Sequence, residues 1–436
     1  MRASGNEEHK ENDKEYSLYT EQIAPNPRKK IKKTMMKALK IVASAALFGT
    51  VAAIFFVFFS SVAGKLKNND EEPESPTITF TLDEDTTEDE ETQTQTQPIE
   101  DIVQNAIEKR ELTKDDYKSM YAALMDVADS GMNSLVTVVS VVNEVDWFDN
   151  SYEKNGNTSG VIIAGDDTRI LVLTNYDAIS GADNIRVLLA SGNTVDATLL
   201  KGDTATNLAV VAVDRSVLNV ADLDKIEVAN LGNSYMVELG EPLIAIGNIF
   251  GYNNTMNYGI ATGVKKVVQE TDGSYTIINT NITCSNGGTG ILLNMDGQVV
   301  GIATSKYDGE VSDGVRLITA YSISDLKILM QQLSNNRDVS CLGIYGQSVT
   351  QSMKTSYGFP AGVYVTSSKQ DSPAFVSGIQ SGDIITGING QSIETMEEYQ
   401  QLLYSYSPGD VIMVNAMRQG RDGYIGIEFQ CTVGVE

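Results

Sequence analysis

The sequence is short of the residues on which most hydrolytic and metal sites depend. Its 436 residues include one histidine, His9, and three cysteines. So few cysteines, none of them in a CxxC pair, exclude a disulfide-dense scaffold and a zinc site of that type. Lys and Arg number 32 against 58 Asp and Glu, which gives a formal net charge of −26. That balance argues against a nucleic-acid binder, because phosphate backbones are bound by clustered Lys and Arg.

Apolar residues, by contrast, are plentiful. They make up 42% of the chain, which is enough to bury a sizeable core, and the length corresponds to two or three domains. Residues 41–64 form a run of 24 residues without a charge. About 20 apolar residues in a helix span a bilayer, so residues 41–64 are predicted to form a transmembrane helix.

The charges on either side of this run predict its orientation. Residues 28–40 hold seven Lys and Arg, whereas the other side has Lys65 and Lys67 followed by acids. The positive-inside rule therefore places a basic tail, residues 1–40, in the cytoplasm. The predicted location is the cell membrane, as a single-pass protein with extracellular C-terminal domains. A cleaved signal peptide is the alternative, but the apolar run and its charged leader are longer than is typical.

An acidic segment follows the apolar run. Residues 70–101 contain 13 acidic residues, half of the formal net charge, and no Lys or Arg. The same stretch is rich in Thr, Gln and Pro, so it cannot bury enough apolar surface to offset the loss of chain entropy. Residues 65–110 are therefore predicted to be an extended, disordered acidic linker.

The pattern of short apolar runs predicts the folded part. An amphipathic helix is expected over 115–131. From residue 134 onward, runs rich in Val, Ile and Leu are separated by Gly, Asn and Asp turns, for example at Asp272-Gly273. This predicts an all-β barrel or sandwich over 125–335 that ends in a helix. Residues 338–434 mix strands and helices and predict a compact α+β module.

Several motifs in this folded part resemble one known family. They are TSGVII at 158–163, LTNYDAI at 173–179, NLAVV at 207–211, IGNIFG at 246–251 and NGGTGILLN at 286–294. In order and spacing they resemble motifs of the HtrA (Do-like) serine proteases, and the similarity extends over 125–436. The resemblance implies a mainly β fold: a trypsin-like double β-barrel at 125–335 and an α+β PDZ domain at 338–434, preceded by the transmembrane helix.

All three residues of that family's catalytic triad are replaced in this sequence. The positions that match its His, Asp and Ser hold Asp177, Asn207 and Gly288. Hydrolysis by this route needs a hydroxyl nucleophile, an imidazole base and a carboxylate that holds the imidazole. Gly288 has no side chain, and an aspartate is a weak base at neutral pH. Because the only histidine, His9, precedes the predicted membrane helix, no intact catalytic residue is expected.

The backbone donors of the same loop are also changed. The family's oxyanion hole uses the N–H group of the nucleophile and the N–H group two residues before it. Here these groups belong to Gly288 and Asn286, and Asn286 stands where the family has Gly. Asn286, Gly287 and Gly288 are therefore predicted to be the remnant of an oxyanion loop rather than a formed hole.

Other chemistry in this loop stays open at the level of sequence. Ser285 and Thr289 lie beside the nucleophile position, and a lysine can activate a serine without histidine. Lysines such as Lys201 and Lys306 are present, but nothing in the sequence places one beside Ser285. The scattered Asp and Asn residues are typical turn formers, and no EF-hand or His/Cys cluster occurs. We expect neither a metal ion nor a cofactor.

The PDZ-like module matches the family at more positions. CLGI at 341–344 resembles its carboxylate-binding loop. The resemblance implies that the N–H groups of Leu342, Gly343 and Ile344 hold the C-terminal carboxylate of a peptide, while the next strand pairs with its backbone. The same resemblance implies a pocket for the last side chain, lined by Leu402, Leu403 and Tyr406. The alternative is a module that packs only against its own barrel.

The cysteines leave one further alternative. Cys341 and Cys431 fall in the first and last expected strands of the PDZ module, where a disulfide would stabilise it. Two buried free thiols are the other interpretation.

Together these features predict a membrane-anchored HtrA-like pseudoprotease of the cell envelope. It would bind peptides or the C-termini of unfolded proteins through its PDZ domain without cleaving them. The alternatives are an active HtrA-like serine endopeptidase in envelope protein quality control, and a non-catalytic subunit in mixed oligomers. Expected partners are protein C-termini, the membrane through residues 41–64, and a homo- or hetero-trimer of the kind common in that family; nucleic acid is not expected.

Overall fold

A computed structural model describes residues 77–83, 113–145, 151–312 and 315–436. The chain divides into two units, Met1–Ser75 and Pro76–Glu436, and every described residue belongs to the second unit. The predicted basic tail at 1–40 and membrane helix at 41–64 lie outside the described residues. Within the described ranges, no helix combines the length and the apolar character that crossing a bilayer requires.

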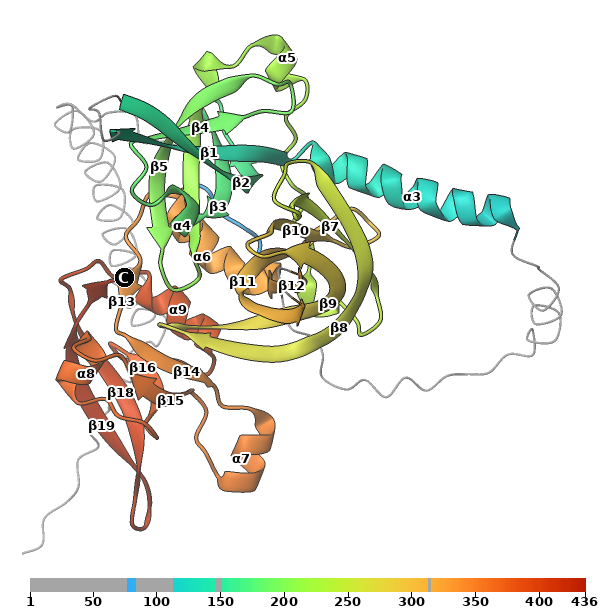
Figure 1. The fold of residues 1–436 in the computed structure, drawn as a ribbon. Helices are drawn as coiled ribbons and strands as arrows, with labels where there is room; N and C mark the ends of the chain where they lie inside the picture. Colours follow the sequence, from blue (N-terminus) through green and yellow to red (C-terminus); the bar gives the residue numbers. More distant parts are fainter. Residues whose placement is uncertain (1–76, 84–112, 146–150, 313–314) are drawn as a thin grey trace, which may run out of the picture. The chain divides into compact units, whose positions relative to one another are not determined.

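Six antiparallel strands, most of them labelled in Figure 1, close the first barrel in the order β1-β2-β3-β6-β5-β4. Alternate residues point into it, as the two-residue period of a strand requires. Val138, Ile162 and Val172 are three of the side chains that fill the interior. The strands are β1 (Leu135–Val145), β2 (Ser151–Gly165), β3 (Arg169–Asn175), β4 (Asn184–Leu188), β5 (Thr194–Asp203) and β6 (Leu208–Asp214).

Helices precede and connect the strands of the two barrels. The predicted N-terminal helix is confirmed as α3 (Lys114–Met132), which begins at a capping box formed by Thr113 and Asp116. A capping box satisfies two of the N–H groups that a helix leaves free at its start. The short helices are α4 (Tyr176–Ile179), η1 (Arg215–Val217), α5 (Val220–Leu223) and η2 (Ser234–Met236).

The second barrel repeats the architecture, in the order β10-β11-β12-β9-β8-β7. Its interior is packed with aliphatic side chains, among them Leu243, Ile278 and Leu292. The predicted closing helix is confirmed as α6 (Ile323–Ser334). The strands are β7 (Pro242–Asn248), β8 (Thr255–Glu270), β9 (Gly273–Ser285), β10 (Thr289–Leu293), β11 (Val299–Ser312) and β12 (Val315–Ser322).

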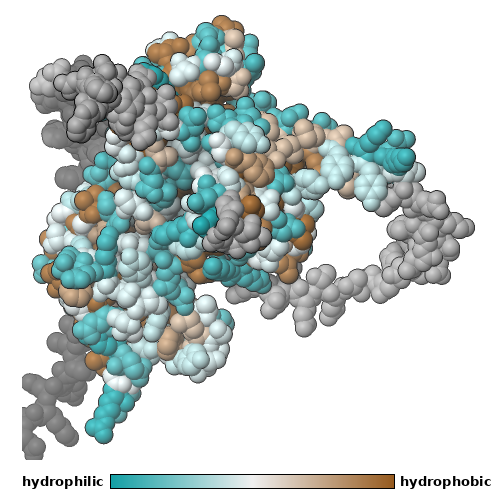
Figure 2. Space-filling view, in the orientation of Figure 1, coloured by the Kyte–Doolittle hydropathy of each residue, from teal (hydrophilic) through white to brown (hydrophobic). Residues whose placement is uncertain are grey.

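The C-terminal module is built on strands in the order β14-β15-β16-β18-β19, with β17 paired to β16. Its strands are β13 (Ser340–Cys341), β14 (Ile344–Ser348), β15 (Val363–Ser368), β16 (Ile384–Ile388), β17 (Gln391–Ser392), β18 (Val411–Gly420), β19 (Gly423–Thr432) and β20 (Gly434–Val435). Its helices are α7 (Gln351–Tyr357), α8 (Pro373–Ser377) and α9 (Met396–Leu403). Figure 2 shows a hydrophilic tip on the β18–β19 hairpin, within a surface where polar and apolar residues are mixed.

One cluster of buried apolar side chains continues from the barrels into the C-terminal module. It includes Ile246 of β7, Leu326 of α6, Ile344 of β14 and Leu403 of α9. Burial of apolar side chains is the main favourable contribution to packing. The barrels and the module are therefore joined through a shared core, with α6 between them.

Part of the predicted disordered linker is ordered. Ile78 and Asn335 exchange two hydrogen bonds of 2.8 and 2.7 Å through the Asn335 side chain. The carboxylate of Asp83 accepts a hydrogen bond from Lys327 of α6 at 2.6 Å. In the segment 78–80, Ile78 and Phe80 are half-buried against the core, and Thr79 between them is exposed. The prediction of a disordered linker was thus wrong for residues 77–83, because the composition of the whole linker does not reveal this short alternating pattern.

The disulfide hypothesis is not supported, because Cys284, Cys341 and Cys431 are all free and buried. Cys341 lies opposite Gly434 in the β13–β20 pair, whereas Cys431 lies opposite Ile412 in β18. The two cysteines therefore occupy different strand pairs. The Cys341 thiol instead donates to Glu436 at 3.3 Å.

Candidate functional site

The position that matches the family's histidine lies at the start of a short helix. Asp177 is exposed in α4, and its N–H donates to the side-chain oxygen of Asn207 at 2.7 Å. Asn207 has a left-handed backbone, with φ 61°, a conformation that asparagine tolerates well. The position of the triad's aspartate therefore serves as a cap for α4. With no imidazole after His9, the Asn207 amide has no base to orient.

The position of the nucleophile has no space for a side chain. Gly288 is buried, and a Cβ added there would lie 2.5 Å from the carbonyl oxygen of Ile249 and 3.2 Å from the Cβ of Cys284. That carbonyl accepts two hydrogen bonds from Ser285, one from its N–H at 3.0 Å and one from its hydroxyl at 3.1 Å. Ile249 is therefore held in the space that a catalytic side chain would need.

The oxyanion remnant forms a turn. The N–H of Gly288 donates to the carbonyl of Ser285 at 3.0 Å, and Gly287 between them has φ 77°. Because this N–H bonds within the turn, it does not point at a substrate carbonyl, as an oxyanion hole requires. Asn286 and Gly287 are exposed at the tip of the turn.

The alternative nucleophiles have other partners. Thr289 joins the two barrels: its hydroxyl accepts from the N–H of Ser159 at 3.0 Å, and its carbonyl accepts from the Ser159 hydroxyl, also at 3.0 Å. Lys201 pairs with Asp338 at 2.5 Å, and Lys306 pairs with Glu270 at 2.6 Å. Neither lysine is therefore placed as the base of a serine dyad. Across the described ranges, no group of three His, Cys, Asp or Glu side chains is arranged to hold a metal ion.

The loop before β14 has the geometry of an anion site. Gly343 has φ 83°, and a Cβ there would lie 2.3 Å from the Cβ of Ser372, so this position requires glycine. The turn directs three consecutive N–H groups to one side, which is how a backbone nest binds an anion. These are the groups expected from the sequence, those of Leu342, Gly343 and Ile344.

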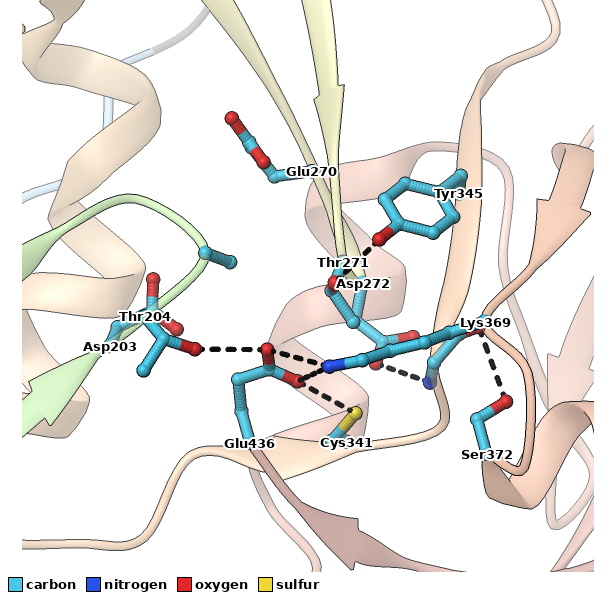
Figure 3. A network of polar contacts seen from close by, with 12 residues as sticks. Asp203, Thr204, Glu270, Thr271, Asp272, Cys341, Tyr345, Lys369, Ser372 and Glu436 are labelled. Atoms are coloured by element: carbon cyan, nitrogen blue, oxygen red, sulfur yellow. Dashed lines mark hydrogen bonds and ion pairs between the residues drawn. The ribbon is translucent and has the colours of Figure 1, made fainter. Parts of the chain in front are cut away.

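A carboxylate of the second barrel fills this nest. Oδ2 of Asp272 accepts from Leu342 at 2.8 Å and from Gly343 at 2.6 Å, while Oδ1 accepts from Ile344 at 3.1 Å. The Tyr399 hydroxyl adds a fourth hydrogen bond, of 2.6 Å, to Oδ1. Figure 3 shows Asp272 at the hairpin tip, beside the contacts of Glu436 with Lys369 and Cys341.

Asp272 itself is 2% exposed. Burial raises the pKa of its carboxyl above the ordinary value, and the hydrogen bonds from Tyr399 and from the loop act in the opposite direction. The four donors occupy the acceptor positions of both oxygens, which suits an ionised carboxylate.

Two of the expected pocket residues, Leu402 and Leu403, lie at the end of α9, and Tyr406 follows that helix. Leu403 is fully buried in the shared core, Leu402 is half-buried, and the Tyr406 hydroxyl accepts a hydrogen bond from Asn389 at 3.1 Å. The sequence predicted a turn at Asp272-Gly273, but it gave no indication that Asp272 reaches a loop 70 residues later. The φ angle of Asp272, 53°, is explained by its place in the turn at the hairpin tip.

Comparisons with known proteins agree with this architecture. The family described as trypsin-like peptidase domain matches residues 158–302, and the PDZ domain family matches residues 328–429. A serine protease Do-like HtrA of Lactobacillus helveticus is 30% identical over 297 residues, which cover 63% of this chain and 70% of that protein. The protein of the same name from Bacillus subtilis is 28% identical over 298 residues, which cover 62% of each chain.

A solved structure of an HtrA-type protease with a decapeptide is similar with a TM-score of 0.49 at 22% identity, covering 72% of this chain and 97% of the other. The Lactobacillus protein shows the family, because it is 30% identical and the match covers 70% of its length. This chain therefore belongs to the HtrA (Do-like) family, in which a trypsin-like peptidase domain precedes a PDZ domain.

Proposed function

We propose that this chain is a pseudoprotease of the HtrA family, which binds peptides or the C-termini of unfolded proteins and does not cleave them. The observation that carries the proposal is the carbonyl of Ile249, which lies 2.5 Å from the position of a Cβ on Gly288. An acyl-transfer reaction needs a nucleophile, a base to take its proton and donors for the oxyanion. At the matching positions this chain has no nucleophilic side chain, an exposed aspartate, and an N–H bonded within its own turn.

Two assays of the purified full-length chain test the absence of cleavage. We expect no degradation of unfolded casein and no labelling by a fluorophosphonate probe, under conditions in which an active HtrA protease gives both. Ser285→Ala and Thr289→Ala serve as matched controls, since these hydroxyls are nearest to the nucleophile position in the sequence. The proposal would be overturned if the wild type degraded casein and either substitution abolished that activity, because the result would identify an active nucleophile.

The binding half of the proposal is supported by the anion site at Leu342–Ile344. Its N–H groups suit the terminal carboxylate of a peptide, and the edge of β14 offers backbone groups for an added strand. We expect affinities in the micromolar range, about −8 kcal/mol. Replacing the terminal carboxylate by an amide should weaken binding at least about tenfold, since charge-assisted hydrogen bonds are lost.

We also propose that the protein is anchored in the cell membrane with its folded domains outside. The uncharged run at 41–64 and its basic N-terminal flank support this orientation. Protease treatment of intact cells should then release the folded domains by cutting the acidic segment before residue 113. Release from lysed cells alone would indicate the opposite orientation.

We propose a homo- or hetero-trimer, and exposed apolar residues of α3 support a contact with other chains. Tyr117, Met120, Tyr121 and Met125 are 46–54% exposed, whereas Leu124 and Ala128 of the same helix are buried. An exposed apolar stripe on a helix is typical of a contact surface. Sedimentation of the full-length chain should show an oligomer that Met120→Glu dissociates. An unchanged sedimentation coefficient in that variant would exclude α3 from the contact.

A further inference from the structure

The β8–β9 hairpin meets the PDZ module at the position where a peptide would bind. The backbone N–H of Asp272 donates to the carbonyl of Ile344, the first residue of β14, at 2.8 Å. The Asp272 carboxylate accepts from the three N–H groups of the loop before β14. A bound peptide uses the same pair of contacts, with the carboxylate in the loop and the backbone N–H of its last residue on the adjoining strand. Asp272 therefore mimics the last residue of a peptide, with its side-chain carboxylate in place of the terminal one.

The end of the hairpin next to this turn contacts both β14 and α9. Tyr275 of β9 is fully buried and accepts a hydrogen bond from Gln400 of α9 at 3.2 Å. A Cβ on Gly273 would lie 2.7 Å from the Gln400 side-chain nitrogen, so a larger residue would disturb the fit. On the other side, Gln269 of β8 contacts Gln347 of β14 at 3.3 Å. These contacts place the end of the hairpin against both walls of the groove between β14 and α9, where a cavity lined by Ser274, Ser348 and Gln400 remains.

Neighbouring contacts fasten the hairpin and the module together. Thr366 of β15 donates to Gln269 at 2.6 Å, and Thr271 donates to Tyr345 at 3.3 Å. Figure 3 shows Thr271 and Asp272 side by side at the hairpin tip, with Tyr345 and Lys369 on the module side. Polar groups on both surfaces are paired here, so separation would expose them to water.

We propose that the 270–273 turn of the β8–β9 hairpin is an internal ligand of the PDZ domain, and that free C-termini bind only when it withdraws. The partner class follows from the chemistry of the loop: a polypeptide with a free C-terminal carboxylate and a backbone N–H at its last residue. This inference rests on the proposed peptide binding, because an internal ligand regulates only a site that has an external one.

The tethered turn has a thermodynamic advantage over a free peptide. A ligand on the same chain acts at an effective concentration of the order of millimolar. The apparent affinity for an external peptide is lowered by the fraction of molecules whose site is open. The wild type should therefore bind free peptides more weakly than a variant that lacks the internal carboxylate.

The experiment compares the full-length wild type with Asp272→Ala and Asp272→Asn. The probe is a set of fluorescein-labelled peptides that end in Val, Leu, Ile or Phe, each as a free acid and as an amide. Asp296→Asn is the matched control, since Asp296 lies in another turn of the same barrel and is exposed. We expect free-acid peptides to bind the Asp272 variants at least about tenfold more tightly than the wild type or the control, and the amides to show no such gain.

Amide hydrogen exchange on the same proteins distinguishes a failure of the internal-ligand proposal from a failure of the proposed peptide binding. The N–H groups of Leu342, Gly343 and Ile344 should exchange slowly in the wild type and in Asp296→Asn, and faster in Asp272→Ala. Equal peptide affinity in the wild type and the Asp272 variants, or unchanged exchange in those variants, would overturn the internal ligand. If exchange becomes faster and no chain binds any peptide, the proposed peptide binding is wrong, and the regulatory role falls with it.

Discussion

The most informative single substitution is Gly288→Ser, which restores the residue type of the family's nucleophile. The new Cβ would lie 2.5 Å from the Ile249 carbonyl oxygen and 3.2 Å from Cys284. Overpacking of this kind costs about 1–3 kcal/mol. Moving the carbonyl away would also break one of its hydrogen bonds from Ser285, worth about 1 kcal/mol. The substitution should therefore lower the free energy of unfolding by about 2–4 kcal/mol.

Activity should not return with that serine. A serine without a general base is a weak nucleophile at neutral pH, and no histidine follows His9. The N–H that should stabilise the oxyanion remains bonded to the Ser285 carbonyl. We expect no casein degradation by Gly288→Ser.

Two control variants separate packing from chemistry. Gly288→Ala brings the same Cβ without a hydroxyl, so it should lose as much stability in urea denaturation as Gly288→Ser. Asn286→Ser places a serine at an exposed position of the same turn and should change stability by less than about 0.5 kcal/mol. Proteolysis by Gly288→Ser, or a stability equal to the wild type, would refute the steric argument for this site.

Three further predictions concern other parts of the fold. Because all the cysteines are buried and burial raises the pKa of the Cys341 thiol, iodoacetamide should add nothing to the folded chain and three groups to the unfolded one; mass spectrometry detects either result. Asp83→Ala should lower the free energy of unfolding by about 3 kcal/mol, because it leaves the Lys327 ammonium, 5% exposed, without its carboxylate; a loss under 1 kcal/mol in urea denaturation would show that this contact is unimportant. Burial raises the pKa of the Asp203 carboxyl above its ordinary value. Between about pH 4, where the unfolded chain loses this proton, and the raised pKa of the folded chain, the folded chain binds more protons than the unfolded chain. The free energy of unfolding should therefore fall as pH rises through this window, relative to Asp203→Asn, and parallel pH profiles of the two proteins would contradict it.

Local patterns predicted most of the fold. Runs of Val, Ile and Leu between Gly, Asn and Asp turns correspond to the strands of both barrels, because strand burial repeats every second residue. The turn between β18 and β19 is short, since β18 ends at Gly420 and β19 begins at Gly423. The short helix α7 and the strand β16 were not predicted at all.

The site was predictable only where it depends on residue identity. The order of motifs was sufficient to locate Asp177, Asn207 and Gly288. The obstruction at Gly288 depends on the Ile249 carbonyl, which lies in another loop, and no sequence pattern reports that distance. The same holds for Asp272, whose partners in the loop before β14 are 70 to 72 residues later in the chain. Its short polar turn is typical of any hairpin, so nothing in the sequence indicates the long-range contact.

The most direct test of binding without cleavage is mass spectrometry of peptides recovered from the Asp272→Ala chain, in which the PDZ loop is expected to be open. The labelled free-acid peptides are incubated with this protein, the retained fraction is eluted, and its masses are compared with those of the starting set. Retained peptides of full length, and no fragments in the unbound fraction, are the predicted result. Fragments that appear with time and disappear when Ser285→Ala is added to the same chain would contradict the account.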